Sequence, residues 1–406
     1  MHSNLNKWSL AVSASLFMAS AALAQSAPPP LKIGVMTDMS GIFSHMGGGG
    51  SAHAAAMAAK DFGGKVNGRT IEIVSADHQN KTEVGASIAR KWYENDGVEM
   101  ITDLTNSAVA VAVQNIAKGL GKINIVAGGA TEALTGKECS PTGIHWIYST
   151  YSLAVGTTKA VVGQGAKKWF FITADYAFGH AMHTRASKII RDMGGTVAGN
   201  VLVPLGTTDY SSYFLQAKAS GAEAIGLAVA GNDLINAIKQ AKEFGITKGG
   251  QRLVASIIFL PEIDAMGLET AQGLMLTTSF YWDRDERTRE WAKRFAPGNG
   301  GKMPTVVHAS TYSAVTNYLK AVEATKSSDP KVVMQKMRET PVDDFFARNA
   351  FIRPDGALVH DLILAEVKKP SESKARWDYY KVLATVPGKE AFIPLDQSEC
   401  PLVKKS

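Results

Sequence analysis

Short apolar runs alternate with helical patterns along the chain after residue 30. The run LKIGVM at 31–36 precedes an alanine-rich helical pattern over 51–62, and a second apolar run at 69–77 precedes a helical stretch over 82–95. Apolar runs of this length, followed by a period near 3.6, are typical of βαβ units. The pattern therefore predicts a parallel sheet with helices on its faces.

The same alternation begins again after about residue 150. The run KKWFFIT at 167–173 leads into a helical stripe that contains Met182, Ile189 and Met193, and further strand-like and helical patterns follow. A repeated rhythm of this kind predicts two similar lobes. The expected fold class is α/β, with two Rossmann-like lobes that each hold a parallel sheet.

Segments beyond residue 279 do not complete a third domain. We expect the helical segments at 279–295 and 310–325 to pack on the first lobe, and the strand-like segments at 361–369 and 377–386 to join the second. The predicted units are a signal peptide at 1–24 and a first lobe formed by 31–149 with 280–352. A second lobe is formed by 150–279 with 353–390, and a C-terminal tail follows at 391–406. The chain would cross between the lobes three times and form a hinge, near 148–152, 279–283 and 350–358.

The first 24 residues have the pattern of a secretory signal peptide. Lys7 is the only charge before an apolar stretch from Trp8 to Ala22, and Ala22-Leu23-Ala24 forms a small-x-small cleavage site. A membrane anchor is disfavoured because this apolar stretch is shorter than the roughly 20 residues that span a bilayer. We expect cleavage after Ala24 and export to the periplasm.

Composition is that of a globular protein. The 406 residues are 45% apolar, which is enough for a sizeable core in each of two or three domains. The 43 basic and 37 acidic side chains are scattered, without the basic stripe of a nucleic-acid-binding protein. Nucleic acid is therefore not expected as a partner.

Only two cysteines occur, Cys139 and Cys400. In an oxidising compartment a disulfide between them is favoured over two buried thiols, which is the alternative. Neither has a histidine or a second cysteine at metal-ligand spacing, so no zinc site is expected.

A glycine run at 47–50 raises the question of a nucleotide site. Gly47, Gly49 and Ala52 satisfy the G-x-G-x-x-G/A dinucleotide pattern, but Gly47 lies ten residues beyond Thr37, where the preceding apolar run ends. A dinucleotide loop needs its first glycine directly after the strand, and no Gly-Lys-Ser/Thr follows. Neither a nucleotide nor any other cofactor is predicted.

Catalytic patterns are equally incomplete. His180 and His183 form an i, i+3 pair without a nearby acid for a metal site, so both are expected at the surface. The stretch from Gly49 to His53 falls short of a nucleophile elbow, because His53 stands at the position of the final glycine. The sequence predicts neither a metal centre nor an enzyme.

The loops after the predicted strands are the best candidates for a binding site. In open parallel sheets, ligands bind beyond the carboxyl ends of the strands, where loops meet helix N-termini. Ser40, Ser107 and Thr131 in these loops, together with backbone N–H groups at helix starts, are suited to bind a carboxylate. Six aromatic residues are suited to enclose an apolar body, with core packing as the alternative for each: Phe43, Tyr151, Tyr176, Phe178, Phe259 and Tyr281.

Three stretches around these loops resemble a known family: KIGVMTDMSGIFSHMGGGGSAHAAAMAAKDF, IVAGGATEALTG and FFITADYAFGHAM. Together with the leader, they are similar in order and spacing to the type I periplasmic solute-binding proteins of ABC importers, in the leucine/isoleucine/valine-binding group. The similarity extends over essentially the whole mature chain. It implies two lobes that close on a solute, a monomer that delivers this solute to a membrane permease, and a partner ATPase that supplies the energy.

The resemblance also implies where the solute binds. The ligand carboxylate would be held near Asn106 and Ser107 and on residues 129–131, and Phe178 with Tyr176 would cover the ligand. The complete set of expected ligand-binding residues is Ser40, Gly41, Phe43, Asn106, Ser107, Gly129, Ala130, Thr131, Tyr151, Asp175, Tyr176, Phe178, Gly231, Asn232, Phe259 and Tyr281.

One departure from the family concerns the ligand's ammonium group. Amino-acid binders of this family place an acid in the last second-lobe loop, where this chain has Phe259 and Leu260 before Glu262. Because an unpaired ammonium in a closed cleft is costly, either Glu262, Asp175 or Asp233 takes this role, or the ligand has no ammonium.

The stretches HWIYSTY, TADYAFGH and SFYWD further resemble a branch of the family associated with aromatic carboxylates. We therefore expect the ligand to be a small hydrophobic or aromatic carboxylate, with a branched-chain amino acid as the alternative. A ligand sensor that docks on a membrane receptor is the alternative to transport.

Overall fold

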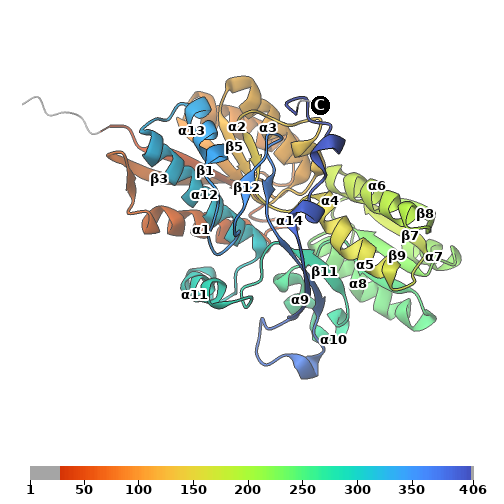
Figure 1. Ribbon diagram of the computed structural model, residues 1–406. Helices are drawn as coiled ribbons and strands as arrows, with labels where there is room; N and C mark the ends of the chain where they lie inside the picture. Colours follow the sequence, from red (N-terminus) through yellow and green to blue (C-terminus); the bar gives the residue numbers. More distant parts are fainter. Residues whose placement is uncertain (1–27, 404–406) are drawn as a thin grey trace, which may run out of the picture.

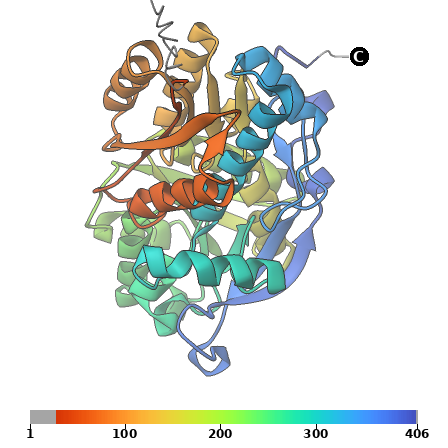
Figure 2. The same cartoon turned by 90° about the vertical axis from the view of Figure 1, so that its left-hand side faces the viewer.

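The computed structural model of the protein describes residues 28–403 (Figure 1). The predicted signal peptide at 1–24 lies outside the described residues, as do the last three residues of the chain. Figure 2 shows two halves stacked one on the other, and in the upper half helices from the start and the end of the chain lie side by side. Each half contains a largely parallel sheet, so the predicted α/β fold class is confirmed.

The first sheet forms the core of the first lobe. Five of its strands are parallel, and the short β2 pairs antiparallel with β3. Side chains alternate along the central strand, because Leu31, Ile33 and Val35 join one apolar cluster and Met36 joins another. The sheet is therefore buried on both faces, as is usual for parallel sheets. The order across it is β2 (Lys65–Val66), β3 (Arg69–Asp77), β1 (Leu31–Thr37), β4 (Val98–Asp103), β5 (Ile123–Val126) and β6 (Gly143–His145).

Helices from distant parts of the chain cover this sheet. One face carries α2 (Thr82–Glu94) and α3 (Ser107–Leu120), which pack against each other. Trp92 of α2 lies directly on Gly34 of β1, where an added Cβ would be 2.4 Å from the indole ring. The other face carries α1 (Gly48–Asp61), α11 (Glu286–Phe295), α12 (Val306–Thr325) and α13 (Pro330–Glu339).

The second sheet forms the core of the second lobe, and its four strands are parallel. The order is β10 (Arg252–Ala255), β9 (Ala224–Ala228), β7 (Lys168–Ala174) and β8 (Thr196–Val203). Strand β7 is apolar over most of its length because it lies inside the sheet and is buried on both faces. The helices of this lobe are α5 (Lys159–Gly163), α6 (Ala177–Asp192), α7 (Ser211–Ala219), α8 (Asn232–Glu243), α9 (Leu260–Met266) and α10 (Leu268–Ala271).

Three connections join the two lobes. The first runs from β6 to α4 (Thr150–Leu153), which continues through a π-helical turn at Ala154–Thr158 into α5. The second runs from β11 (Met275–Thr278) to α11. The third leads from the hairpin of β12 (Phe351–Ile352) and β13 (Leu358–Val359) to β14.

A small antiparallel sheet follows the third connection. In it β14 (Leu362–Val367) lies between β11 and β15 (Tyr380–Val386), and its apolar side chains join the core of the second lobe. The last helix, α14 (Gly388–Ala391), packs against α4. Helix α14 therefore lies close to the first connection between the lobes.

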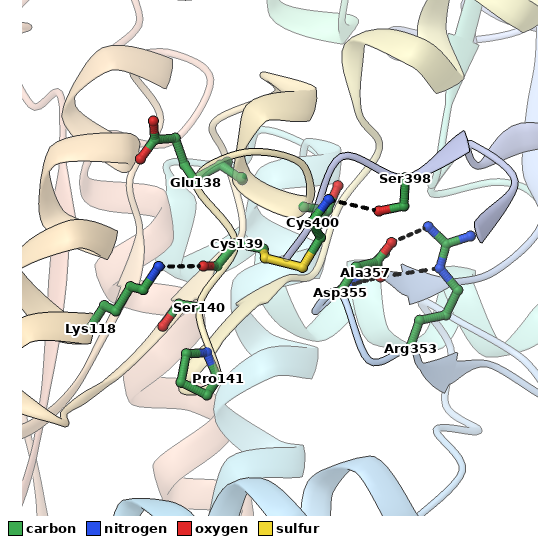
Figure 3. The surroundings of a disulfide bond; sticks show 12 residues. Lys118, Glu138, Cys139, Ser140, Pro141, Arg353, Asp355, Ala357, Ser398 and Cys400 are labelled. Atoms are coloured by element: carbon green, nitrogen blue, oxygen red, sulfur yellow. Dashed lines mark hydrogen bonds and ion pairs between the residues drawn. A yellow bond between two sulfur atoms is a disulfide. The ribbon is translucent and has the colours of Figure 1, made fainter. Parts of the chain in front are cut away.

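A disulfide joins Cys139, in the segment between β5 and β6, to Cys400 near the C-terminus (Figure 3). The two Cα atoms are 5.7 Å apart, although 261 residues separate the cysteines in sequence. Lys118 Nζ donates to the Cys139 carbonyl at 3.0 Å and so holds the loop from the α3 side. Closing so long a loop stabilises a fold by about 5 kcal/mol in the chain-entropy model. The bond ties the C-terminal tail to the first lobe.

Between residues 28 and 403, no helix is long and apolar enough to cross a membrane, and no group of three or more His, Cys, Asp or Glu side chains is arranged to hold a metal ion. His180 lies at the surface, as expected, and pairs with Asp175 across 2.8 Å. His183 is instead half buried, because its ring packs on the edge of Phe171.

Candidate functional site

Loops from both lobes meet around a small cavity of about 10 Å³. They follow β1, β4 and β5 in the first lobe and β7, β9 and β10 in the second, at the carboxyl ends of the strands where ligands of open parallel sheets bind. The cavity is near the lower limit for a single water molecule, so a larger solute can enter only when the lobes separate. Its lining residues are Phe43, Met46, Thr105, Ser107, Gly128 and Ala130 from the first lobe, and Tyr176, Phe178, Ala230 and Ile257 from the second.

Ser107 places a hydroxyl at the N-terminus of α3, facing this cavity. Its Oγ accepts hydrogen bonds from the backbone N–H groups of Ala130 at 3.1 Å and Thr131 at 3.2 Å. The hydroxyl proton is then left to donate to another acceptor, such as a ligand oxygen. The preceding residue, Asn106, caps the helix, because its Oδ1 accepts from the N–H groups of Ala108 and Val109.

The turn after β4 has an unusual backbone. Asp103 and Leu104 have φ angles of +73° and +60°, in the left-handed region that non-glycine residues rarely adopt. Such a conformation costs about 1 to 3 kcal/mol per residue and is often found at functional sites. This backbone turns the Thr105 hydroxyl toward the Asp103 carboxylate, and the hydroxyl donates a hydrogen bond to it. The same hydroxyl lies 3.0 Å from the Thr37 hydroxyl. The strained turn thus forms the floor of the cavity on the first-lobe side.

Asp103 is an acid buried directly beneath that floor, with 0% of its surface exposed. Burial raises the pKa of its carboxyl to about 6, although nearby hydroxyls, among them those of Ser51 and Thr105, lower it in part. A Cβ on Gly128, which lines the cavity, would lie 2.9 Å from Asp103 Oδ1. This carboxyl therefore lies directly behind two lining residues, Gly128 and Thr105.

The glycine run at 47–50 fits around the same acid and around a buried histidine. A Cβ on Gly47 would lie 2.9 Å from Asp103 Oδ2, and one on Gly50 would lie 2.4 Å from His308 Nε2. His308 Nε2 donates to the Gly47 carbonyl at 2.8 Å, because its Nδ1 accepts the Thr305 N–H. Close packing inside the first lobe thus accounts for Gly47 and Gly50, whereas Gly48 has a φ of +50° and an added Cβ on Gly49 would meet nothing within 4 Å. Helix α1 starts at Gly48, three residues before the predicted start at Ser51.

Backbone contacts join the lobes at the edge of the cavity. The N–H of Asn232 in the second lobe donates to the Ile42 carbonyl in the first at 3.1 Å. Gly231 has a φ of +62°, and an added Cβ would lie 2.4 Å from that carbonyl oxygen. Glycine is needed here both for its backbone angle and for this close approach.

Two ion pairs also bridge the lobes. Glu132 accepts two hydrogen bonds from the Arg185 guanidinium, at 2.8 and 3.1 Å, and that guanidinium lies 4.9 Å above the Tyr151 ring. His45 Nε2 lies 3.1 Å from Glu262 Oε1, and Glu262 is only 1% exposed. Burial is the largest single effect and lowers the pKa of His45, but the charge of Glu262, its hydrogen bond and the charge of Asp38 together raise the pKa overall. Both pairs favour the state in which the lobes touch.

The structure brings together five of the sixteen residues that the sequence predicted for the site: Phe43, Ser107, Ala130, Tyr176 and Phe178. Asn106, Gly129 and Thr131 lie in the same loops, where Thr131 caps a short 3-10 helix and an added Cβ on Gly129 would meet the Leu104 carbonyl. Gly231 and Asn232 contribute the interlobe backbone contact, and Tyr151 lies beneath Arg185.

Five predicted residues have other partners in the structure. Ser40 donates to Asp77 at 2.6 Å, the Gly41 N–H donates to Asp38 at 2.7 Å, and the exposed Asp175 pairs with His180. The remaining two are aromatic residues in apolar cores: Phe259 packs on Tyr148, and Tyr281 packs on Tyr380 and donates to Asp378.

Five lining residues were not predicted: Met46, Thr105, Gly128, Ala230 and Ile257. Met46, Thr105, Gly128 and Ala230 belong to loops that follow predicted strands, so their position in the chain was the available signal. Met46, Ala230 and Ile257 carry no chemistry that distinguishes them from core residues.

Residues 30–374 match the sequence model of a family described as periplasmic binding protein. The chain belongs to this family. The resemblance noted from the sequence is thereby confirmed, and membership implies a periplasmic location for this periplasmic binding protein.

Solved structures agree with this assignment. A periplasmic binding protein from Burkholderia mallei is 48% identical, with a TM-score of 0.91 over 92% of this chain and 99% of that one. A branched chain amino acid ABC transporter periplasmic ligand-binding protein from Burkholderia xenovorans is 41% identical, with a TM-score of 0.82 over 92% of this chain and 100% of that one.

A solute binding protein of an ABC transporter from R. palustris, solved in complex with 4-hydroxybenzoate, has a TM-score of 0.80 over 88% of this chain and 97% of that one. At 22% identity, its likeness to this periplasmic binding protein concerns the fold alone.

Proposed function

We propose that this periplasmic binding protein captures a small aromatic or hydrophobic carboxylate between its lobes and delivers it to an ABC permease. The protein itself catalyses no reaction, and the ATPase of the transporter supplies the energy. The observation that carries the proposal is the chemistry of the interlobe cavity. Its lining is apolar or glycine except for the hydroxyls of Thr105 and Ser107 and the phenol group of Tyr176. Apolar walls with a few polar groups are typical of sites for small apolar ligands that carry one polar end.

The carboxylate would bind at the start of α3. The Ser107 hydroxyl has a proton to donate, and the N-terminus of this 14-residue helix favours a negative charge. The rings of Phe43, Tyr176 and Phe178 would enclose the rest of the ligand; the first two have centroids 6.2 Å apart across the lobes. Opening by a few ångströms would let a flat ring enter between them.

The three acids expected as partners of an ammonium group are engaged elsewhere. Glu262 pairs with His45 and accepts the Phe259 N–H, and Asp175 is exposed beside His180. Asp233 is 1% exposed and accepts the Gly206 N–H at 2.9 Å. Within residues 28–403, no acid lines the cavity itself, which favours a ligand without an ammonium group.

A branched-chain amino acid is the second candidate. The Burkholderia xenovorans relative is a branched chain amino acid ABC transporter periplasmic ligand-binding protein, and Asp103 lies against Gly128 and Thr105 of the cavity lining, where its charge would attract an ammonium group.

Thermal unfolding with a panel of ligands tests the proposal. A ligand at a hundred times its dissociation constant stabilises the protein by about 2.7 kcal/mol, so binders should raise the melting temperature clearly. We expect benzoate, 4-hydroxybenzoate or cinnamate to do so, and leucine, isoleucine and valine not to. A response confined to the aliphatic amino acids would overturn the proposal.

Variants then locate the site. Ser107→Ala and Tyr176→Ala should each weaken binding of the responding ligand at least tenfold, measured by calorimetry. Tyr281→Phe changes an aromatic residue outside the cavity lining and should bind like the unaltered protein. Equal affinity in all three variants would place the ligand elsewhere.

A further inference from the structure

A second cavity lies beside the hinge rather than between the strand ends of the two lobes, and its volume is about 370 Å³. Arg284 of the second connection forms one wall, and residues 359–361 of the third connection form another. The rest of the lining comes from the segment 346–351 and from 388–389 in α14. Helix α14 packs on α4, where the first connection ends. The second and third connections therefore line this hinge cavity directly, and it shares no lining residue with the interlobe cavity.

The charges around the hinge cavity are unbalanced. Arg284, Arg348 and Lys389 line it, against the single acid Asp361, whose Oδ1 already accepts the Gly388 N–H at 2.8 Å. Arg348 is paired outside the cavity, because its guanidinium donates to Asp285 at 2.6 Å. Across residues 28–403, neither Arg284 nor Lys389 has an acid within 4.0 Å or a side-chain hydrogen bond. Two cations are thus left without partners at one cavity.

Arg284 is the more informative of the two because it is half buried. Burial lowers the pKa of its guanidinium, and the positive charge of Arg348 lowers it further, although Asp285 and Asp361 act in the opposite direction. An anionic partner would therefore stabilise the charged guanidinium in this position. Its planar fork of donors matches two oxygens of a carboxylate or phosphate.

Two further side chains, His360 and Phe351, belong to the lining of the hinge cavity. His360 is 3% exposed, its Nδ1 lies 2.9 Å from the Leu358 carbonyl, and its Nε2 is buried without a hydrogen-bond partner. Phe351 keeps 52% of its surface exposed at the cavity wall. The cavity therefore combines positive charge with an apolar edge, whereas His360, whose Nδ1 donates to the Leu358 carbonyl, offers an oxyanion no donor at Nε2.

We propose that the hinge cavity is a binding site for a small oxyanion, a carboxylate or a phosphate, held between Arg284 and Lys389. This site is separate from the interlobe cavity and does not depend on which solute that cavity takes. Because its walls come from segments on both sides of the hinge, an occupant would link those segments noncovalently.

Calorimetric titration of the mature protein with inorganic phosphate, and separately with acetate, tests the site at constant ionic strength. We expect saturable binding of at least one of these anions. Phosphate alone would identify a phosphate site, and acetate alone a carboxylate site. No saturable binding of either anion would overturn the proposal.

The variants Arg284→Gln and Lys389→Gln should each weaken the binding at least fivefold. Lys389 is exposed, so its replacement gives a readout even if Arg284→Gln impairs folding. The matched control is Arg287→Gln, an exposed arginine that pairs with Asp343 at 3.6 Å and does not line the cavity. Undiminished binding in both cavity variants, or an equal loss in the control, would also overturn the proposal.

Discussion

The replacement Asp103→Asn isolates the buried carboxyl beneath the interlobe cavity. The carboxyl is 0% exposed and its pKa is raised to about 6, whereas an aspartate in an unfolded chain has a pKa of about 3.9. Between these values the unfolded chain releases the proton and the folded protein keeps it, so the free energy of unfolding falls as the pH rises. A difference of about 2 pKa units corresponds to about 3 kcal/mol, and the loss is nearly complete by about pH 7.

An asparagine has nearly the same shape and cannot ionise, so the variant lacks this loss. Its melting temperature relative to the unaltered protein should therefore rise by about 3 °C between pH 4 and pH 8, for an unfolding entropy of about 2.1 cal/mol/K per residue. Melting curves followed by circular dichroism in steps of half a pH unit measure the difference.

The control variant is Asp192→Asn, which removes an exposed carboxylate that pairs with Lys188 on α6. Its melting temperature should follow that of the unaltered protein over the same range. Parallel pH profiles for Asp103→Asn and the unaltered protein would refute the reasoning. They would show that Asp103 releases its proton at the same pH in the folded and unfolded states.

The remaining predictions concern ligand binding and closure. At pH 7.5, where Asp103 is largely ionised, Asp103→Asn should bind a carboxylate without an amine more tightly than the unaltered protein does, and an amino acid more weakly. Calorimetry with benzoate and leucine measures both affinities, and the opposite order would contradict this prediction. Glu132→Gln removes an ion pair between the lobes. A partly exposed pair contributes about 1 kcal/mol, so the dissociation constant of the ligand should rise about fivefold. Lys188→Gln removes an ion pair within α6 and should leave the dissociation constant unchanged. X-ray scattering should show a smaller radius of gyration when ligand is added, and an identical radius would argue against closure.

The sequence predicted the strands of the parallel sheets because each is an apolar run with its own turn signals. The helical pattern predicted over 82–95 is α2 (Thr82–Glu94), whose buried side chains include Ala89, Trp92 and Tyr93. Helix α4 has only four residues and continues into a π-helical turn, so it is too short for a periodic pattern. Helix α13 was missed although Asp329 and Pro330 form a recognisable helix start.

For the site, position in the chain was a better guide than residue type. Ser107 and Phe178 line the cavity because they follow strands of a parallel sheet at its carboxyl edge. Ser40 and Tyr281 have suitable side chains, but their hydroxyls bond to acids 37 and 97 residues away, which no local pattern reveals. The burial of Asp103 is also invisible in sequence, because it depends on glycines from two other loops.

The disulfide orders the events of maturation in time. A secreted chain emerges from its N-terminus, so Cys139 reaches the oxidising side 261 residues before Cys400, the only other cysteine. Throughout that interval Cys139 has no partner within its own chain. The bond is therefore one of the last covalent events, and a chain that is cut short before Cys400 carries an unpaired thiol. A thiol reagent applied under denaturing conditions would distinguish such interrupted molecules from finished ones.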